Sequence, residues 1–336
     1  MKYFLLTALF VSLSFLSFLG FLLVFLSSPP VQKQATVEVK VERGESFSSV
    51  VRKLKDKGVI SNEKLFSLWA RLSDVDKKIH WGLYRFEMPL PPKEILNRMV
   101  LGKGVFHRIT IPEGLTLKEI ADHLQKGEIA KKDQFLAEAN SPELLSLLGL
   151  DGKGIEGYLF PETYYFTPLI TEREILMTMA EKFRGIFSPM MEQQAKEMGL
   201  NLHEVVTLAS LIEKETGIEA ERPLVSAVFH NRLKSKIPLQ SDPTVIYGLK
   251  HFSGNLKRKD LRTHSPYNTY LIQGLPPGPI CNPGLSSLMA TLHPAPVPYL
   301  YFVSKNDGSH LFSVSLEEHN KAVKLYQSGK QRLPRR

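Results

Sequence analysis

Hydrophobic side chains are concentrated at the N-terminus, where no charged residue occurs between Tyr3 and Leu26. About 20 apolar residues suffice to cross a hydrocarbon core of roughly 30 Å, so this run predicts a transmembrane helix within residues 1–28. A cleaved signal peptide is the alternative, but its apolar region is shorter, about 7–15 residues, and the usual Ala-x-Ala site is missing. Lys2 precedes the run and no basic cluster follows it directly, which predicts a cytoplasmic N-terminus and an extracytoplasmic remainder of the chain.

The pattern changes directly after the apolar run. Residues 29–36 begin with two prolines, are otherwise mostly polar and show no periodicity, which is typical of a short linker. Val37, Val39 and Val41 then alternate with other residues in the period-2 pattern of a strand. Folded sequence is therefore expected from residue 37 onward.

A strand–turn–helix pattern occurs twice, in residues 41–58 and 111–127. Each copy has a glycine turn, a Ser or Thr suited to cap a helix, and an amphipathic helix that ends at Lys-Gly. Chance produces such a unit fairly often, but the pair also resembles a duplicated LysM module, a small fold whose family binds glycan chains. We expect residues 37–154 to form a LysM-like α/β region, with a strand near 81–86 and a helix over 92–99 between the copies.

The composition narrows the class of protein. Of the 336 residues, 43% are hydrophobic and 23% are charged, which excludes both a disordered chain and a membrane protein with many spans. The chain holds 43 basic and 34 acidic residues, and the net charge of +9 favours nucleic acid, an anionic membrane surface or an acidic cell-wall polymer as partner. Cys281 is the single cysteine, so no intramolecular disulfide or multi-cysteine metal site can form. We expect neither a metal nor an organic cofactor.

The second half of the chain predicts helices near 173–187 and 189–198, followed by a third over 202–216. Asn201 is a suitable N-cap for the third helix, and Gly217 is a suitable terminator. Apolar residues recur along this helix with the spacing i, i+3, i+4 and i+7, which predicts that it is largely buried. They are Val205, Leu208, Ala209 and Ile212.

Two glutamates, Glu213 and Glu215, fall on opposite margins of this apolar stripe. A carboxyl group at the edge of an apolar surface, near the negative end of a helix, is expected to have a raised pKa. A carboxyl that is protonated at neutral pH is what a general acid needs to cleave an ether-like bond. A surface salt-bridge pattern with Lys214 is the alternative, and periodicity alone does not choose between the two glutamates.

Polar and aromatic residues gather on proline-braced loops that follow this helix. Amide and hydroxyl groups beside aromatic faces suit a sugar polymer, which offers hydroxyls, N-acetyl groups and apolar ring faces. The candidate ligand-binding residues are Gln240, Ser241, Asp242, Tyr267, Asn268 and Tyr270. Structural roles are the alternative for some of them, because Asp242 before Pro243 is a good helix N-cap and both tyrosines are equally suited to a core.

Several long motifs follow one another between Leu208 and Asn320. They include LASLIEKET at 208–216, VFHNRL at 228–233, LQSDPTVIYG at 239–248, YNTY at 267–270, GLPPGPI at 274–280 and HPA at 293–295. With these motifs, the anchor and the LysM-like region, the chain resembles the endolytic murein transglycosylases of the YceG type, also called MltG. Cys281 departs from the pattern, since some relatives have a small residue such as Ala or Thr there, and this argues against a cysteine nucleophile.

The resemblance implies an α+β catalytic domain over 155–336, with a helical core like that of lysozyme and the lytic transglycosylases. It assigns the catalytic acid to Glu215, the second glutamate of Glu-Lys-Glu-Thr, and gives Glu213 and Thr216 supporting positions. The implied reaction is lytic cleavage of the bond between N-acetylmuramic acid and N-acetylglucosamine inside peptidoglycan strands, which leaves a 1,6-anhydro end. The candidate ligand-binding residues would orient the glycan.

The resemblance further implies a single-pass protein of the inner (plasma) membrane that contacts wall synthases such as penicillin-binding proteins and ends the growth of nascent strands. Nucleic acid is not expected as a partner, because the folded part would lie outside the membrane. Two other functions stay open. One is a hydrolysing muramidase with Asp242 or Glu213 as nucleophile or base, and the other is a non-catalytic glycan-binding scaffold that recruits synthases.

Overall fold

The computed structural model describes residues 2–30, 35–150 and 152–327. Part of the expected linker, residues 31–34, and the last part of the expected catalytic domain, residues 328–336, lie outside the described residues. The mixture of helices and short strands confirms an α+β protein that begins with an apolar helix.

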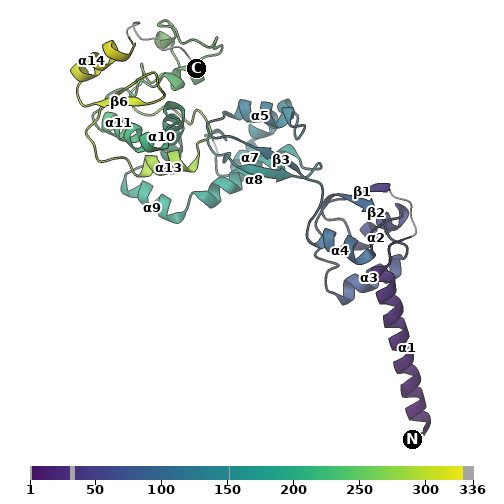
Figure 1. Ribbon diagram of the computed structural model, residues 1–336. Coiled ribbons are helices and arrows are strands. Elements are labelled where there is room, and N and C mark those ends of the chain that lie inside the picture. Colours follow the sequence, from purple (N-terminus) through teal and green to yellow (C-terminus); the bar gives the residue numbers. More distant parts are fainter. Residues whose placement is uncertain (1, 31–34, 151, 328–336) are drawn as a thin grey trace. The chain divides into compact units, whose positions relative to one another are not determined.

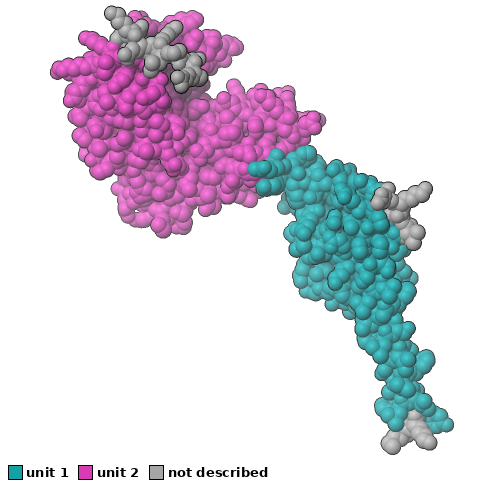
Figure 2. Space-filling view, in the orientation of Figure 1, with its two compact units in different colours: residues 1–108, 165–170 teal, residues 109–164, 171–336 magenta. Residues whose placement is uncertain are grey.

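The chain divides into two compact units, shown in different colours in Figure 2. Unit 1 comprises residues 1–108 and 165–170, and unit 2 comprises residues 109–164 and 171–336. Each unit has its own buried apolar cluster.

Unit 1 is a small α/β fold built around one antiparallel strand pair (Figure 1). Val39 and Val41 of the first strand are buried, as are Tyr84 and Phe86 of the second, so one face of the pair forms the core of the unit. The elements are α1 (Lys2–Ser27), β1 (Ala35–Val41), α2 (Phe47–Asp56), α3 (Glu63–Leu72), β2 (Gly82–Met88) and α4 (Pro92–Val100). The predicted strands near 37 and 81–86 and the predicted helix over 92–99 are thereby confirmed.

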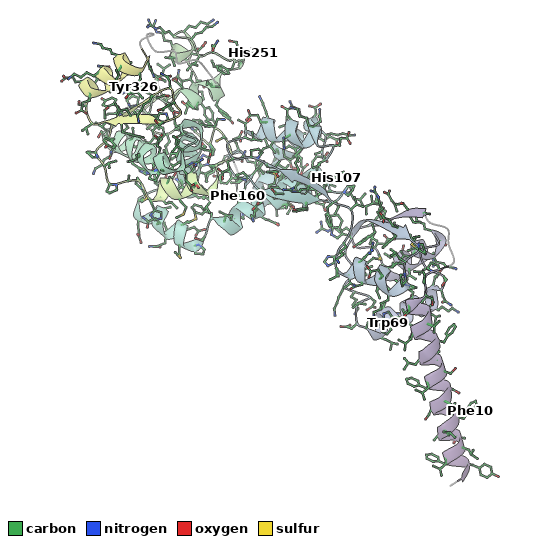
Figure 3. All side chains as sticks on the ribbon, in the orientation of Figure 1. Phe10, Trp69, His107, Phe160, His251 and Tyr326 are labelled. Carbon is green, nitrogen blue, oxygen red and sulfur yellow. The ribbon has the colours of Figure 1, made fainter. Side chains whose placement is uncertain are left out.

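Helix α1 has an exposed part and a packed part. Every residue from Tyr3 to Phe21 is exposed, and Figure 3 shows the Phe10 side chain projecting from the helix. At about 1.5 Å per residue this part is about 29 Å long, close to the roughly 30 Å of a hydrocarbon core. Leu22 and Leu26 are instead buried, because the end of α1 packs against α3 and α4. Among the described residues α1 contains the one stretch that is long and apolar enough to span a membrane.

Both predicted strand–turn–helix segments form, but they belong to different units. Ser46 caps α2 by accepting a hydrogen bond from Ser49 N, and Thr116 caps α5 (Leu117–Lys126) in a reciprocal arrangement with Glu119. The strand of the second copy, β3 (His107–Thr110), pairs with β4 (Thr163–Phe166) and not with the β1–β2 pair. Its helix packs against α6 (Lys132–Ala139). The compact units therefore divide near residue 108, whereas we expected a domain boundary near residue 155.

Unit 2 is mainly helical, and α10 (Leu202–Glu215) lies at its centre. Every residue of α10 from Val205 to Ile212 is buried, and the helix packs against α11, α12 and α13. The remaining elements are α7 (Pro142–Leu147), α8 (Glu172–Ile186), α9 (Pro189–Glu197), η1 (Glu219–Glu221), α11 (Arg222–Lys234), α12 (Asp242–Gly248), η2 (Asp260–Arg262), α13 (Leu285–Leu292), β5 (Tyr301–Ser304), β6 (His310–Ser313) and α14 (Leu316–Gln327). The helices predicted near 173–187, 189–198 and 202–216 are confirmed, with Asn201 as the N-cap of α10.

The end of α10 differs by one residue from the expected position. The helix ends at Glu215, because Thr216 takes an extended conformation with φ −140° and ψ 136°. The Thr216 hydroxyl accepts a hydrogen bond from Ile218 N at 3.0 Å and donates one to Glu221 at 3.3 Å, which stabilises this turn of the backbone. Glu215 is thus the last helical residue.

Candidate active site

Glu215 stands at the C-terminal end of a helix whose other side is buried in the core of unit 2. Its Oε1 accepts a hydrogen bond of 2.5 Å from Ser241 Oγ, and the residue is partly exposed. The other carboxyl oxygen, Oε2, has no hydrogen-bond partner among the residues that the structure describes. One oxygen is therefore fixed in place while the other remains available to a ligand.

The surroundings of Glu215 raise its pKa to about 7. Burial by the surrounding protein is the main cause, because it disfavours the ionised carboxylate. The negative charge of Asp242 acts in the same direction, whereas the Ser241 hydroxyl and the positive charge of Arg232 lower the pKa. The raised pKa that the sequence predicted is confirmed, and near neutral pH both forms of the carboxyl group are populated.

Ser241 is itself held in place on three sides. Its backbone N–H donates to Thr269 Oγ1 at 2.9 Å, and its carbonyl accepts from Thr244 Oγ1 at 2.7 Å. Ser241 is the N-cap residue of α12, yet its hydroxyl makes no cap hydrogen bond because it is directed to Glu215. The alternative role of Asp242 as the N-cap is therefore wrong, and Asp242 is the first helical residue.

Three of the expected ligand-binding residues present polar groups near the surface of this site. Gln240 and Asp242 are exposed, and Tyr270 is partly exposed. The Tyr270 hydroxyl donates to Asp242 Oδ1 at 2.7 Å, which links the loop of Tyr270 to the start of α12. Gln240 has a positive φ of 51° and its backbone N–H donates to Thr269 O at 3.0 Å, so its backbone is also fixed.

Tyr267 and Asn268 occupy interior positions in the same loop. Asn268 is fully buried, its Nδ2 donates to the carbonyls of Leu261 and Thr263, and its Oδ1 accepts from Tyr270 N. Because its amide group is already bonded on both sides, Asn268 braces the loop and does not reach a ligand directly, contrary to our expectation. The Tyr267 ring packs against Tyr247 with 4.8 Å between ring centroids. This contact agrees with the core role that was the alternative for Tyr267.

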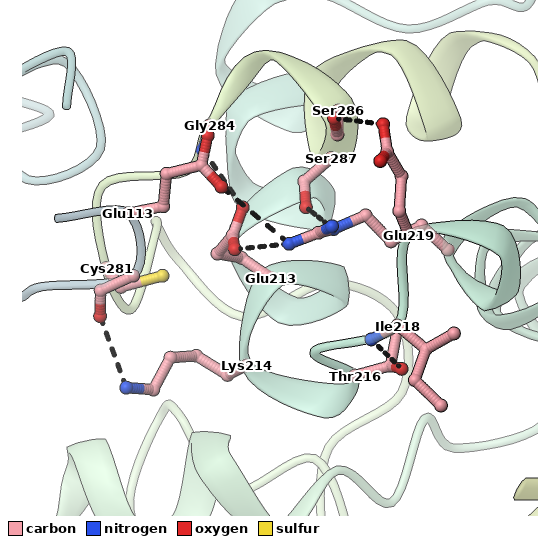
Figure 4. Close-up of polar contacts among 12 residues, drawn as sticks. Glu113, Glu213, Lys214, Thr216, Ile218, Glu219, Cys281, Gly284, Ser286 and Ser287 are labelled. Atoms are coloured by element: carbon pink, nitrogen blue, oxygen red, sulfur yellow. Dashed lines mark hydrogen bonds and ion pairs between the residues drawn. The ribbon is translucent and has the colours of Figure 1, made fainter. Parts of the chain in front are cut away.

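Glu213, the other candidate glutamate, is occupied by a buried ion pair (Figure 4). Its Oε1 lies 2.9 Å from Arg222 Nη2, its Oε2 accepts from Gly284 N at 3.0 Å, and only 5% of its side chain is exposed. Arg222 in turn donates to Ser287 Oγ at 3.1 Å. Glu213 therefore joins the end of α10 to the starts of α11 and α13. The geometry thus distinguishes a structural Glu213 from Glu215, a choice that the periodicity of the sequence left open.

Arg232 is a residue that sequence reasoning did not single out. Its side chain is buried and donates to the carbonyls of Leu300 and Leu239 and, at 3.3 Å, to Gln240 Oε1. Its guanidinium also lies 5.2 Å from the centroid of the Tyr301 ring. Arg232 thus places a positive charge near Glu215 without forming an ion pair with it, an arrangement that no local sequence pattern reveals.

Comparison with known proteins places the chain in a family. The sequence profile of the YceG-like family matches residues 39–325. The chain belongs to the YceG-like family. The resemblance seen in the motifs is thereby confirmed.

The relatives of the chain include two named bacterial proteins and a solved structure. The chain is 35% identical over 318 residues to the endolytic murein transglycosylase of Bacillus subtilis (strain 168), covering 90% of this chain and 88% of that protein. It is 28% identical over 320 residues to the protein of the same name from Streptococcus pneumoniae (strain D39), covering 85% of this chain and 58% of that protein. The 2.6 Å crystal structure of a yceG-like protein from Listeria monocytogenes matches with a TM-score of 0.60 and 33% identity, over 86% of this chain and all of that one.

A second carboxyl group with a raised pKa in this YceG-like protein is that of Glu156, which sequence reasoning did not single out as a candidate. Glu156 accepts hydrogen bonds from Leu117 N and Asn282 Nδ2, both at 2.9 Å, and from Tyr247 OH at 3.3 Å. Burial raises its pKa to about 7. The neighbouring Gly157 has φ +88°, and a Cβ there would lie 2.5 Å from Pro279 Cγ, so only glycine lets this segment pack so closely.

The described residues of this YceG-like protein offer neither a cluster of metal-binding side chains nor a reactive thiol. The residues that the structure describes contain no group of three or more His, Cys, Asp or Glu side chains arranged to hold a metal ion. Cys281 is fully buried, its thiol donates to Ser210 O at 3.3 Å, and burial raises the thiol pKa. A buried thiol with a raised pKa is a poor nucleophile, so Glu215 is the best-placed reactive group of the described site.

Proposed function

We propose that this protein is an endolytic murein transglycosylase, which cleaves the bond between N-acetylmuramic acid and N-acetylglucosamine inside peptidoglycan strands. The observation that carries the proposal is Glu215, a carboxyl with a pKa of about 7, one fixed oxygen and one available oxygen. The relatives from Bacillus subtilis and Streptococcus pneumoniae, which carry this name, support the same activity.

The reaction uses one carboxyl group twice. Protonated Glu215 gives its proton to the glycosidic oxygen, the bond from that oxygen to muramic acid C1 breaks, and positive charge develops at C1. The carboxylate then takes the proton of the C6 hydroxyl of the same sugar, and O6 attacks C1 to form the 1,6-anhydro ring. Because the nucleophile belongs to the substrate, its effective concentration is high and no water is consumed.

The residues around Glu215 have separate tasks in this mechanism. Ser241 fixes Oε1, so Oε2 is the oxygen that carries the proton to and from the sugar. The positive charge of Arg232 lowers the pKa of Glu215, so that the ionised form remains populated near neutral pH. Gln240, Asp242 and Tyr270 orient the glycan, and the remaining candidates, which are Tyr267, Asn268, Glu213 and Thr216, hold the loops and the end of α10 in place.

The proposed acid is tested by E215Q in the full chain. Glutamine keeps the size of the side chain but carries no transferable carboxyl proton, so kcat on purified glycan strands should fall by about 10²–10⁴-fold. The variant should keep the circular dichroism spectrum and the melting temperature of a folded protein. Turnover within about tenfold of the wild type would contradict the assignment.

D242N tests whether Asp242 is a reacting group, as in a muramidase, or only orients the glycan. If Asp242 only orients the glycan, D242N should keep measurable turnover and give the same products as the wild type. Mass spectrometry distinguishes the two reactions, because the 1,6-anhydro product is lighter than the hydrolysis product by one water. A hydrolysed product from the wild type would establish the muramidase alternative. Glycan retention without any cleavage would establish the non-catalytic scaffold.

We further propose that unit 1 is the LysM-like part of the protein and that α1 is its anchor in the plasma membrane, with the N-terminus in the cytoplasm. The exposed apolar surface of α1 from Tyr3 to Phe21 supports the anchor, and the strand–turn–helix segment that Ser46 caps supports the LysM-like fold. A lysozyme-like helical core in unit 2 belongs to the same proposal. This placement would bring the enzyme to nascent strands and to the penicillin-binding proteins that make them.

A further inference from the structure

The loop between α12 and Tyr267 carries a concentration of positive charge that no step of the proposed reaction uses. Residues 249–264 contain five basic residues and one acidic residue, which gives +4 of the chain's net charge of +9. No ion pair with a carboxylate is formed by any of the five within the part of the chain that the structure describes. The five, all exposed, are Lys250, Lys257, Arg258, Lys259 and Arg262.

The base of this loop is closed by tight packing of its two ends. A Cβ at Gly248 would clash with Ser265 Oγ and would lie 3.3 Å from Tyr267 Cβ, so a side chain at this position would push the two ends apart. Farther along the loop, Asn268 Nδ2 holds the carbonyls of Leu261 and Thr263. The charges are therefore carried by a loop with a fixed base.

Both ends of the loop continue directly into the candidate active site. The loop begins after α12, which is capped by Ser241 and starts at Asp242, and it ends at the segment that contains Tyr270, which bonds to Asp242. The short helix η2 of the loop packs against α12. Figure 3 shows His251, another residue of this loop, at the outer edge of unit 2. The positive charge thus stands beside the site and faces outward.

We propose that this basic loop, residues 249–264, binds the carboxylates of the peptide stems and so makes peptide-bearing strands the preferred substrate. The proposal rests on the proposed function, because it concerns the polymer that Glu215 would cleave. The stem peptide is attached to the muramic acid residue whose C1 reacts, so its carboxylates leave the strand close to the site. Exposed ion pairs are weak singly, but several cations together raise the local concentration of an anionic polymer.

The test compares the full chain in detergent with the variant K257Q/R258Q/K259Q on two substrates. One substrate is glycan strands with free stem carboxylates, and the other is the same strands after carbodiimide-mediated amidation of those carboxylates. On the free strands the KM of the variant should rise by about three- to tenfold with kcat unchanged. On the amidated strands the variant and the wild type should have equal KM values. About 0.5 M NaCl should remove the difference on the free strands, because exposed charges are then screened.

A matched control removes the same charge elsewhere in unit 2. The variant K126Q/K131Q/K196Q neutralises three exposed lysines outside the loop, and its KM should stay within about twofold of the wild type on both substrates. An equal rise in KM on amidated strands, an equal effect of the control, or no effect of the loop variant would each overturn the proposal. So would a loss that appears only in nanodiscs of anionic lipid, since the loop would then serve the membrane.

These outcomes are independent of the test of the catalytic acid. If the loop proposal fails while the wild type still forms 1,6-anhydro ends, the proposed function stands without the preference for peptide-bearing strands. If E215Q retains turnover, the proposed function fails whatever the loop variant does.

Discussion

Glu215 combines opposing influences that leave its pKa near neutrality. Burial and the charge of Asp242 favour the protonated form, while the Ser241 hydroxyl and the charge of Arg232 favour the ionised form. A carboxyl with a pKa far above 7 would hold its proton too firmly to act as an acid, and one at an ordinary pKa would already be ionised. The balance suits a group that, in the proposed mechanism, first gives and then takes a proton.

The raised pKa of Glu215 has a consequence for stability. A carboxyl whose pKa is raised by folding stabilises the protein below its unfolded pKa, and that stability is lost as the pH rises through the folded value of about 7. E215Q does not titrate at this position. We therefore expect E215Q to become more stable relative to the wild type, by about 1–3 kcal/mol, between pH 4.5 and pH 8.

Urea denaturation of both proteins at the two pH values measures this difference. Glu156, whose pKa is also about 7, titrates in both proteins, so its contribution cancels in the comparison. A stability difference between E215Q and the wild type that does not change with pH would mean that folding leaves the pKa of Glu215 at its ordinary value.

Sequence reasoning proposed Glu215 as the acid, but it did not find the residues that tune its pKa. The position of Glu215 follows from the periodicity of one helix and from the motif, both of which are local. Ser241 bonds to Glu215 across 26 positions of the chain, and Arg232 acts through space without a direct contact. The polar side chain of Asn268 predicts a ligand contact, yet whether an amide faces a ligand or the interior depends on tertiary packing.

At the scale of elements, the end of α10 is held by the ion pair of Glu213 and Arg222. Both side chains are nearly inaccessible, with 5% and 10% exposed, and each makes a further hydrogen bond, to Gly284 N and to Ser287 Oγ. The pair therefore joins three helices directly beside Glu215. Glu213 cannot move toward a substrate without leaving the buried Arg222 with Glu113, at 3.8 Å, as its remaining carboxylate neighbour.

Removing one partner of this ion pair should cost more than removing both. R222A leaves the carboxylate of Glu213 buried without its cation, and we expect a loss of about 3 kcal/mol in the free energy of unfolding. The double variant E213Q/R222M leaves neither charge of the pair buried, so its loss in the free energy of unfolding should be smaller than that of R222A by about 1–2 kcal/mol. Equilibrium denaturation of the two variants and the wild type gives both values. A double variant that is less stable than R222A would show that the pair contributes through its hydrogen bonds and not through its charge.

The sequence predicts the individual helices more accurately than it predicts which strands pair and which segments share a compact unit. Capping residues such as Asn201, Ser46 and Thr116 act within four residues, so the sequence alone located the helices that they begin. The partner of β3 lies about fifty residues farther along the chain, in β4, and nothing in the local pattern distinguishes this pairing from a repeat of the first unit. The compact units differ from the expected domains for that reason.

At the scale of the whole molecule, the proposed orientation in the membrane gives a direct test. Cys281 is replaced by alanine, and a new cysteine is introduced at the exposed Lys64 of unit 1. A membrane-impermeant maleimide should label this cysteine in intact spheroplasts, because unit 1 lies outside the cytoplasm in our proposal. A cysteine in a tag before Met1 should be labelled only after the membrane is opened. The reverse labelling would contradict the proposed topology.

The packing of Leu22 and Leu26 into unit 1 leaves no hinge where the chain leaves the exposed part of α1. A transmembrane helix tilts when the bilayer is thinner than its apolar length, and it stands more upright when the bilayer is thicker. The rest of unit 1 would then rotate together with the helix as a rigid body. The thickness of the lipid layer would thereby set the angle at which the first external part of the enzyme meets the wall.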